Sequence, residues 1–147
     1  MSIKEQLKAA LVEAMKAKDT IRKNTIQMAR AAILQIEKDQ LTELDDNGVI
    51  EVLAREVKKR KDVLPDYERS GRDDLVADLN REIEVLMAYL PEQLTESEVE
   101  EIVRAAITET GASGMKEMGK VMAAVMPRTK GRADGKLVNA LVRKFLS

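Results

Sequence analysis

Apolar residues recur at intervals of three and four along most of this chain. That spacing places side chains on one face of an α-helix, and no stretch alternates apolar and polar residues for long enough to predict a strand. Residues that favour helices, chiefly Ala, Leu, Glu, Lys, Arg and Met, dominate the sequence. The pattern therefore predicts an all-α protein.

About four helices are expected before residue 92, arranged as a helical hairpin or bundle. The second should fade near Asp39, and the run from Asp45 to Gly48 predicts a turn. A short break at Ser70-Gly71 should make the third and fourth helices an antiparallel hairpin. Pro65 should end or kink the third helix, because its ring removes a backbone donor. The inward-facing sets are expected to be Ile3, Leu7, Leu11 and Met15; Ile21, Met28, Ala32 and Ile36; Ile50, Leu53 and Val57; and Leu75, Leu79, Ile83, Leu86 and Leu90.

Three shorter helices are expected after a boundary at Pro91 to Leu94. The sequence thus divides into an N-terminal helical domain, residues 1–92, and a small three-helix domain, residues 93–147. Thr95 and Glu98 match a capping box. The stretch from Val121 to Met126 is apolar on every side, which predicts a buried helix that Pro127 stops. The inward sets are Val99, Ile102, Val103 and Ala106; Met118, Val121, Met122 and Val125; and Leu137, Val138, Leu141 and Phe145.

Charge changes this picture, because it is nearly balanced overall but unevenly distributed. Residues 115–147 hold eight basic and two acidic residues, a net charge of +6, while the remainder holds 17 basic and 24 acidic residues, a net charge of −7. Such asymmetry favours an acidic body with a basic contact surface over a uniformly solvated surface.

The basic residues gather around the connection that follows Pro127. Arginine can bond phosphate oxygens in pairs, lysine supplies a mobile charge, and glycine lets backbone N–H groups approach a phosphate. Asp134 can cap the last helix, whose N-terminus adds a positive dipole end. The local alternative is that the glycines only turn the chain and the cations only keep it in solution. The predicted phosphate-binding residues are Lys120, Arg128, Lys130, Gly131, Arg132, Gly135 and Lys136.

Catalytic chemistry finds little support in the sequence. The chain has no cysteine and no histidine, so thiol nucleophiles, disulfides and the usual zinc and iron sites are absent. No catalytic residues, metal or cofactor are predicted, and Ser113 is expected to cap a helix rather than act as a nucleophile with a nearby lysine. No apolar run approaches the roughly 20 residues of a membrane span. A cytoplasmic protein without a membrane partner is expected.

Three further patterns have competing explanations. The methionines Met115, Met118, Met122 and Met126 could form an adaptable docking stripe, but core packing is the preferred interpretation. The basic run Lys58 to Lys61 is interpreted as a solvated face. Tyr89 and Phe145 lie among apolar residues and are assigned to the core, so the stacking surfaces of a single-strand binder are missing.

The sequence resembles a known family at several linked motifs. These are Tyr89-Leu-Pro-Glu-Gln-Leu, Gly111-Ala-Ser, Met118-Gly-Lys-Val-Met and Lys130-Gly-Arg-Ala-Asp-Gly, with Met126-Pro between the last two. Together they look like the YqeY-like family, and the resemblance runs from Ile3 through Leu146. The part from Glu96 onward also resembles the C-terminal tail domain of the GatB component of the aspartyl/glutamyl-tRNA amidotransferase. Pro65 departs from the family, whose members usually continue the helix there.

The resemblance implies a two-part all-α protein linked to tRNA-dependent amidation. Family labels often include carbon–nitrogen ligase activity with glutamine as the amido donor. The related tail domain, however, implies contact with the tRNA elbow, and the kinase-like pocket and the amidase of the amidotransferase have no counterpart here. The matching basic-loop residues are Lys120, Lys130, Gly131, Arg132, Gly135 and Lys136.

The functional prediction is an accessory protein that binds tRNA or a tRNA-processing complex through its C-terminal basic loop. The alternative is a helical protein–protein adaptor whose N-terminal helices dock on a protein partner without contacting RNA. Four phosphate contacts would give a salt dependence with a logarithmic slope of about −3 to −4.

Overall fold

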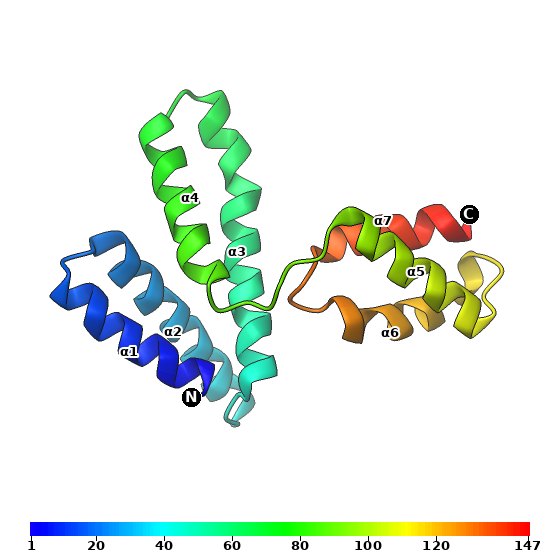
Figure 1. Ribbon diagram of the computed structural model, residues 1–147, viewed down its shortest axis with the longest axis horizontal. Coiled ribbons are helices and arrows are strands. Elements are labelled where there is room, and N and C mark those ends of the chain that lie inside the picture. Colours follow the sequence, from blue (N-terminus) through cyan, green and yellow to red (C-terminus); the bar gives the residue numbers. More distant parts are fainter. The chain divides into compact units, whose positions relative to one another are not determined.

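The computed structural model describes residues 1–147 and contains only helices (Figure 1). The all-α prediction is therefore confirmed. The chain divides into two compact units, Met1–Leu90 and Pro91–Ser147. The helices are α1 (Ile3–Lys16), α2 (Thr20–Gln40), α3 (Asp46–Arg69), α4 (Asp73–Met87), α5 (Glu96–Thr110), the short 3₁₀ helix η1 (Met115–Glu117), α6 (Met118–Thr129) and α7 (Gly135–Leu146). None of them is long and apolar enough to cross a membrane.

The N-terminal unit consists of two helical hairpins packed on each other. α1 pairs with α2 and α3 pairs with α4, as expected for the second pair, and α2 packs against both α3 and α4. Each helix contributes a fully buried side chain to one core, namely Leu7, Ile26, Leu53 and Leu86. Thr25 is also buried, and its hydroxyl donates to the carbonyl of Ile21 at 2.7 Å.

The buried faces of α1 and α2 differ from the predicted ones. Met15 and Met28 are more than half exposed. Strict spacing by four residues advances about 40° around the helix at each step, so a long run of such positions drifts off the core. The buried residues are instead Ile3, Leu7, Ala10 and Ala14 in α1, and Thr25, Ile26, Ala29 and Ile33 in α2.

Neither internal proline ends its helix. α3 continues through Pro65 as far as Arg69, and α6 continues through Pro127 as far as Thr129. The stop predicted at Pro127 is therefore wrong, and of the two outcomes predicted for Pro65, an end or a kink, the end does not occur. A proline removes one helical hydrogen bond, the one to the carbonyl four residues earlier. Those carbonyls belong to Lys61 and Ala123, which are exposed residues, so water can take the place of the missing donor.

A buried arginine joins three helices of the N-terminal unit. The Nε–H of Arg60, on α3, donates to Glu82 of α4 at 3.2 Å, and its Nη1 donates to the carbonyl of Glu56 at 3.0 Å and to the Glu56 carboxylate at 3.4 Å. Its Nη2 lies 3.8 Å from the sulfur of Met28 on α2. Arg60 and Glu56 are both buried, and Lys59 also pairs with Glu56. The predicted solvated face at Lys58 to Lys61 therefore contains a core residue.

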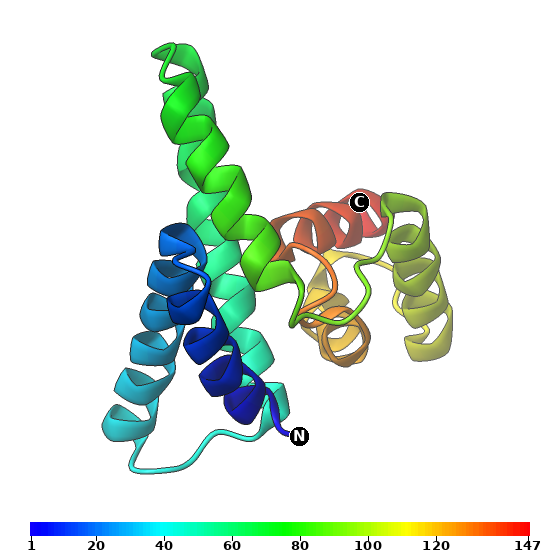
Figure 2. The same cartoon turned by 60° about the vertical axis from the view of Figure 1, so that its left-hand side comes forward.

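Beyond Arg60 the α3–α4 hairpin continues without the other two helices. In both views the tip of this hairpin extends past the end of α2 (Figures 1 and 2). The ion pair between Arg81 and Asp19, at 3.2 Å, ties α4 to the α1–α2 connection near the base of this extension. We call residues 61–80 the arm.

The C-terminal unit packs α5 against α6 and α7 around a valine-rich core. Thr95 and Glu98 form the predicted capping box, and Asp134 caps α7 by accepting from the N–H of Lys136. α6 is not buried on every side, because Ala123 and Met126 are exposed. The fully buried valines of this unit are Val99, Val103, Val121, Val125, Val138 and Val142.

Candidate functional site

The connection between α6 and α7 is a tight turn held by its own backbone. The N–H groups of Arg132 and Ala133 donate to the carbonyl of Thr129 at 2.8 and 3.0 Å. Gly131 has a φ of 72°, a left-handed conformation that costs other residues about 1–2 kcal/mol. The turn therefore favours a glycine at 131 whatever else the loop does.

This turn is also fastened to the segment that precedes α5. The backbone N–H of Leu94 donates to the carbonyl of Arg132 at 2.8 Å, and the side-chain amide of Gln93 donates to the carbonyl of Gly131 at 2.8 Å. In return, the Nε–H of Arg132 donates to the carbonyl of Glu92 at 3.2 Å. These three bonds form what we call the clasp, and they join positions about forty residues apart in the sequence.

Both arginines among the predicted phosphate ligands have protein partners. Arg128 donates to both carboxylate oxygens of Glu109 on α5, at 3.0 and 3.3 Å. Arg132 acts in the clasp, and its charge also reaches Glu98. The pKa of Glu98 is lowered first by hydrogen bonds from the backbone and side chain of Thr95, and further by Arg132. Both arginines lie partly at the surface, so their remaining donors can still meet an anion.

The other predicted ligands are arranged differently. Lys136 is exposed at the start of α7, and Lys130 is exposed in the turn beside it. Lys120 is exposed in the first turn of α6, ten residues before Lys130 and therefore about 15 Å away along the helix axis. The structure thus brings Arg128, Lys130, Gly131, Arg132, Gly135 and Lys136 to one end of α6 and leaves Lys120 at the other.

Gly135 differs from Gly131 in what the fold demands of it. It begins α7 with no positive φ, and a Cβ built there would meet nothing within 4 Å. An alanine would therefore fit. The sequence could not distinguish these two glycines, because the difference lies in backbone conformation.

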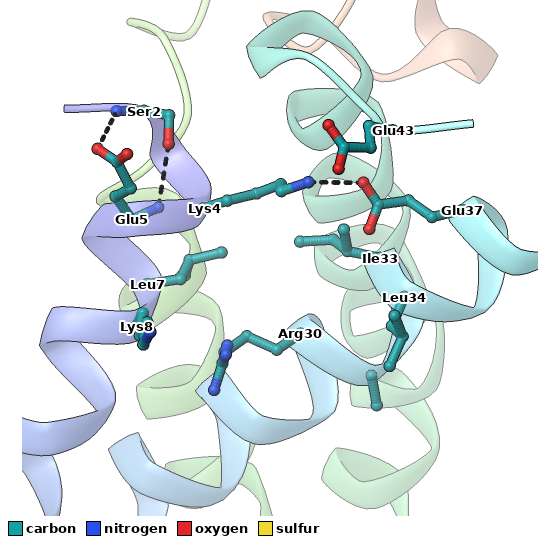
Figure 3. A pocket seen from close by; sticks show the side chains of 11 residues that line it. Ser2, Lys4, Glu5, Leu7, Lys8, Arg30, Ile33, Leu34, Glu37 and Glu43 are labelled. Carbon is teal, nitrogen blue, oxygen red and sulfur yellow. Dashed lines mark hydrogen bonds and ion pairs between the residues drawn. The ribbon is translucent and has the colours of Figure 1, made fainter.

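A second candidate site is a groove of about 610 Å³ between α1 and α2 (Figure 3). Leu7 and Ile33 point into it from the two helices, and Leu34 lies beside them. Lys4 crosses the gap to pair with Glu37 at 2.6 Å. The hydrogen bond to Glu37 raises the pKa of Lys4, while the bond from Lys4 and one from the N–H of Leu44 lower the pKa of Glu37.

The remaining groove charges are mixed in sign. Lys8 and Arg30 line it without a side-chain partner, while Glu5 is engaged in the capping box of α1 and Glu43 lies near Lys4. With three cations and three carboxylates, the groove has no net charge to concentrate an anion. The lowered pKa of Glu37 keeps that carboxyl ionised, so it cannot serve as a general acid near neutral pH. The sequence pattern did not predict this groove.

The methionine stripe is divided between core and surface. Met118 and Met122 pack against the C-terminal core, whereas Met115 and Met126 are exposed by 43% and 40%. Tyr89 and Phe145 pack against the cores of their own units, and the guanidinium of Arg104 lies 4.3 Å from the centre of the Phe145 ring. The core interpretation therefore holds for the two central methionines and for both aromatic residues, and it fails at the ends of the stripe.

Comparison with known proteins supplies a family. The chain is 30% identical over 144 residues to "Altered inheritance of mitochondria protein 41, mitochondrial" of Pyrenophora tritici-repentis, covering 96% of this chain and 79% of that protein. It is 47% identical over 58 residues to the E-type component of glutamyl-tRNA(Gln) amidotransferase of Thermococcus sibiricus, covering 40% of this chain and 9% of that protein.

A second amidotransferase component of the same type, from Methanococcus maripaludis strain C7, is 28% identical over 134 residues, which is 89% of this chain and 21% of that protein. The chain therefore spans only a small part of the amidotransferase components it matches. The family profile described as Yqey-like protein matches residues 4–146. The chain belongs to the YqeY-like family and is related to components of tRNA-dependent amidotransferases.

Proposed function

We propose that this protein is an accessory factor of tRNA-dependent amidation that contacts tRNA phosphates through the basic end of its C-terminal unit. The observation that carries the proposal is the similarity to two proteins named for glutamyl-tRNA(Gln) amidotransferase. We expect a region that is similar to part of such enzymes to bind their substrate or their other components. The proposed contact residues are Lys120, Arg128, Lys130, Gly131, Arg132, Gly135 and Lys136.

Charge placement supports a contact made with the RNA backbone. Lys130 and Lys136 are exposed around the start of α7, so their charges add to the positive end of the helix dipole. Arg128 and Arg132 are positioned beside them by Glu109 and Glu92. Lys120, about 15 Å away, would reach a separate phosphate group. Folded RNA can be recognised in this way, through its shape, phosphates and 2′-hydroxyls.

In this proposal the amidation chemistry belongs to the partner complex. The carbon–nitrogen ligase label of the family would then describe the reaction that the protein assists, because the chain supplies no histidine or cysteine and no recognised acid–base pair. The cytoplasm is the compartment we propose, although the fungal relatives are named mitochondrial proteins.

The test is tRNA binding by fluorescence anisotropy across a salt series. The informative variant is Lys120→Glu with Lys136→Glu, because neither side chain has a partner in the fold and stability should be preserved. The control is Lys8→Glu with Arg30→Glu, which makes the same change in charge in the α1–α2 groove. We expect the first variant to weaken binding at least ten-fold and to flatten the salt slope by about 2, and the control to change affinity less than three-fold.

Two outcomes would overturn the RNA contact. One is the absence of tRNA binding by the wild-type chain at physiological salt. The other is an equal loss of affinity in both variants, which would indicate a general effect of charge. Amidation or glutaminase turnover by the isolated chain would overturn the accessory role.

The adaptor alternative is favoured by a different observation, the uncovered arm of the N-terminal unit. The adaptor alternative involves no RNA contact, so the absence of tRNA binding in the anisotropy test would favour it.

A further inference from the structure

The arm is the longest part of the chain without a buried side chain. Between Arg60 and Val85 no residue is buried, although this interval includes most of α4 and the last third of α3. Its apolar side chains lie outside the set that packs on the N-terminal core. Half-buried between the two helices are Leu64, Tyr67, Leu75, Val76 and Leu79, while Val63 is 40% exposed.

A two-helix hairpin of this kind leaves its apolar seam open to solvent along one or both sides. A helix becomes stable mainly by burying its apolar face, and two helices alone bury little of it. Lower in the same unit, α2 packs against α3 and α4 and completes the core. The arm lacks any such third helix (Figures 1 and 2).

The arm also holds the chain's excess negative charge. It contains three basic and six acidic residues, a net charge of −3, whereas the rest of the N-terminal unit is +1 and the C-terminal unit is +1. Two of the arm's three cations are already paired, Arg69 with Asp66 and Arg72 with Asp74. Four carboxylates have no side-chain partner: Asp62, Glu68, Asp73 and Asp78.

These charges decide which class of partner can cover the seam. RNA is repelled by the carboxylates, and the arm of a second copy carries the same sign of charge. A helix with apolar residues on one face and Lys or Arg along its flanks would match both the uncovered apolar side chains and the negative charge of the arm. Such a helix would pack on the arm in the way that α2 packs on the rest of α3 and α4. Its basic side chains would pair with the four unpartnered carboxylates of the arm.

We infer that the arm is a docking surface for a basic amphipathic helix of a partner protein. The α3 part of the arm, Lys61 to Arg69, is about 14 Å long, which matches about ten residues of the docked helix. Such helix-in-groove binding uses apolar anchors for affinity and flanking charges for orientation and selectivity.

The test uses two synthetic 18-residue helical peptides that share a leucine face and carry either lysine or glutamate on the other face. Binding to the full chain is measured by anisotropy, and the site is mapped by hydrogen–deuterium exchange. The arm variant is Asp62→Lys with Asp78→Lys, one change on each helix. Its matched control is Glu92→Lys with Glu101→Lys, two exposed acids of the C-terminal unit.

We expect the lysine peptide to bind the wild-type chain and the glutamate peptide to bind at least ten-fold more weakly. The arm variant should lose at least ten-fold in affinity for the lysine peptide, the control should lose less than three-fold, and residues 61–80 should gain protection from exchange. Val63→Ser, which keeps the charge and changes an exposed position, should weaken binding a few-fold. This second variant keeps the test decisive if the double lysine variant fails to fold.

The inference is overturned if neither peptide binds, if the control loses as much affinity as the arm variant, or if protection appears in the α1–α2 groove instead. Protection of the arm by tRNA would also overturn it, because the partner would then be a nucleic acid. None of these outcomes depends on whether the basic loop binds tRNA.

Discussion

The basic loop and the acidic arm are both strongly charged, but the fold uses their charges in opposite ways. In the loop, Arg128 and Arg132 bond to Glu109 and to the carbonyl of Glu92, and the turn is closed by the clasp. In the arm, most carboxylates have no partner and the apolar side chains lack a covering helix. The basic loop, which is the more conspicuous charge run in the sequence, is therefore the one whose charged side chains are bonded within the fold.

This difference shows that a charge run does not by itself identify a contact surface. A cation in a turn can be bonded to a carbonyl forty positions away, whereas four of the six acids of the arm have no side-chain partner. Single substitutions can establish whether side chains of the arm contribute less to stability than core side chains do. They can also establish whether the residues of the loop contribute to stability, to RNA binding or to both.

The largest expected effect lies at the base of the arm. Arg60→Ala should lower the free energy of unfolding of the N-terminal unit by about 3 kcal/mol, because it leaves the buried Glu56 carboxylate with only Lys59 as a partner. Leu75→Ala, within the arm, should cost only about 1 kcal/mol because that side chain is half-buried.

Urea unfolding followed by tyrosine fluorescence can measure both effects. The chain has two tyrosines and no tryptophan, and both tyrosines lie in the N-terminal unit. Equal costs for the two substitutions would mean that the arm is as much part of the core as its base.

The next effect separates the two glycines of the loop region. Gly131→Ala should destabilise the C-terminal unit by about 1–2 kcal/mol, because of its positive φ. Gly135→Ala should change stability by less than about 0.5 kcal/mol, because nothing crowds the new methyl group. Exchange rates of the amides of α6 and α7 measure both. If Gly135→Ala weakens tRNA binding without loss of stability, that glycine serves a close approach of the ligand.

A smaller effect is expected from Arg132→Lys, which keeps the charge and removes the Nε–H donor of the clasp. The C-terminal unit should lose about 1 kcal/mol, while tRNA affinity should change less than three-fold. Exchange and anisotropy measured on the same sample distinguish the two roles. A ten-fold loss of affinity with unchanged stability would show that the guanidinium acts on RNA and not on the linker segment.

The smallest effect concerns the ion pair between Lys4 and Glu37 across the α1–α2 groove. These side chains are paired within the fold, as Arg128 and Glu109 are near the loop. Lys4 and the N–H of Leu44 lower the pKa of Glu37 below its ordinary 4.5. Glu37 is therefore protonated at a lower pH in the folded state than in the unfolded state. The stabilisation from Glu37 is thus complete above pH 4.5 and is lost as the pH falls through the lowered value.

The unfolding midpoint in urea, followed by tyrosine fluorescence from pH 7 to pH 3, measures this loss. The wild-type midpoint should fall more steeply below pH 4.5 than the midpoint of Glu37→Gln. Parallel curves for the two proteins would contradict the assignment.

Much of the fold follows from local pattern. Capping at Thr95, Glu98 and Asp134 was predictable because each cap involves residues two or three positions apart. The stop predicted at Pro127 was wrong, and Pro65 did not end its helix, because the carbonyl that each proline leaves unbonded belongs to an exposed residue. That exposure is a property of tertiary structure.

The candidate site was less predictable than the helices. Residue types in the basic loop indicated phosphate chemistry, but the partners of Arg128 and Arg132 lie 19 and 40 positions away and leave no local trace. The arm was hidden for a related reason. Its leucines have the same spacing as core leucines, and only the position of α2 reveals that they lack a cover.

The clasp has a consequence for how this module can be moved between proteins. All three of its hydrogen bonds lie within Pro91–Ser147, so they do not depend on any residue of the N-terminal unit. A fragment that begins at residue 91 keeps all three bonds, whereas one that begins at residue 95 loses every one of them. A unit closed in this way can be attached to a different preceding domain without redesign of the junction.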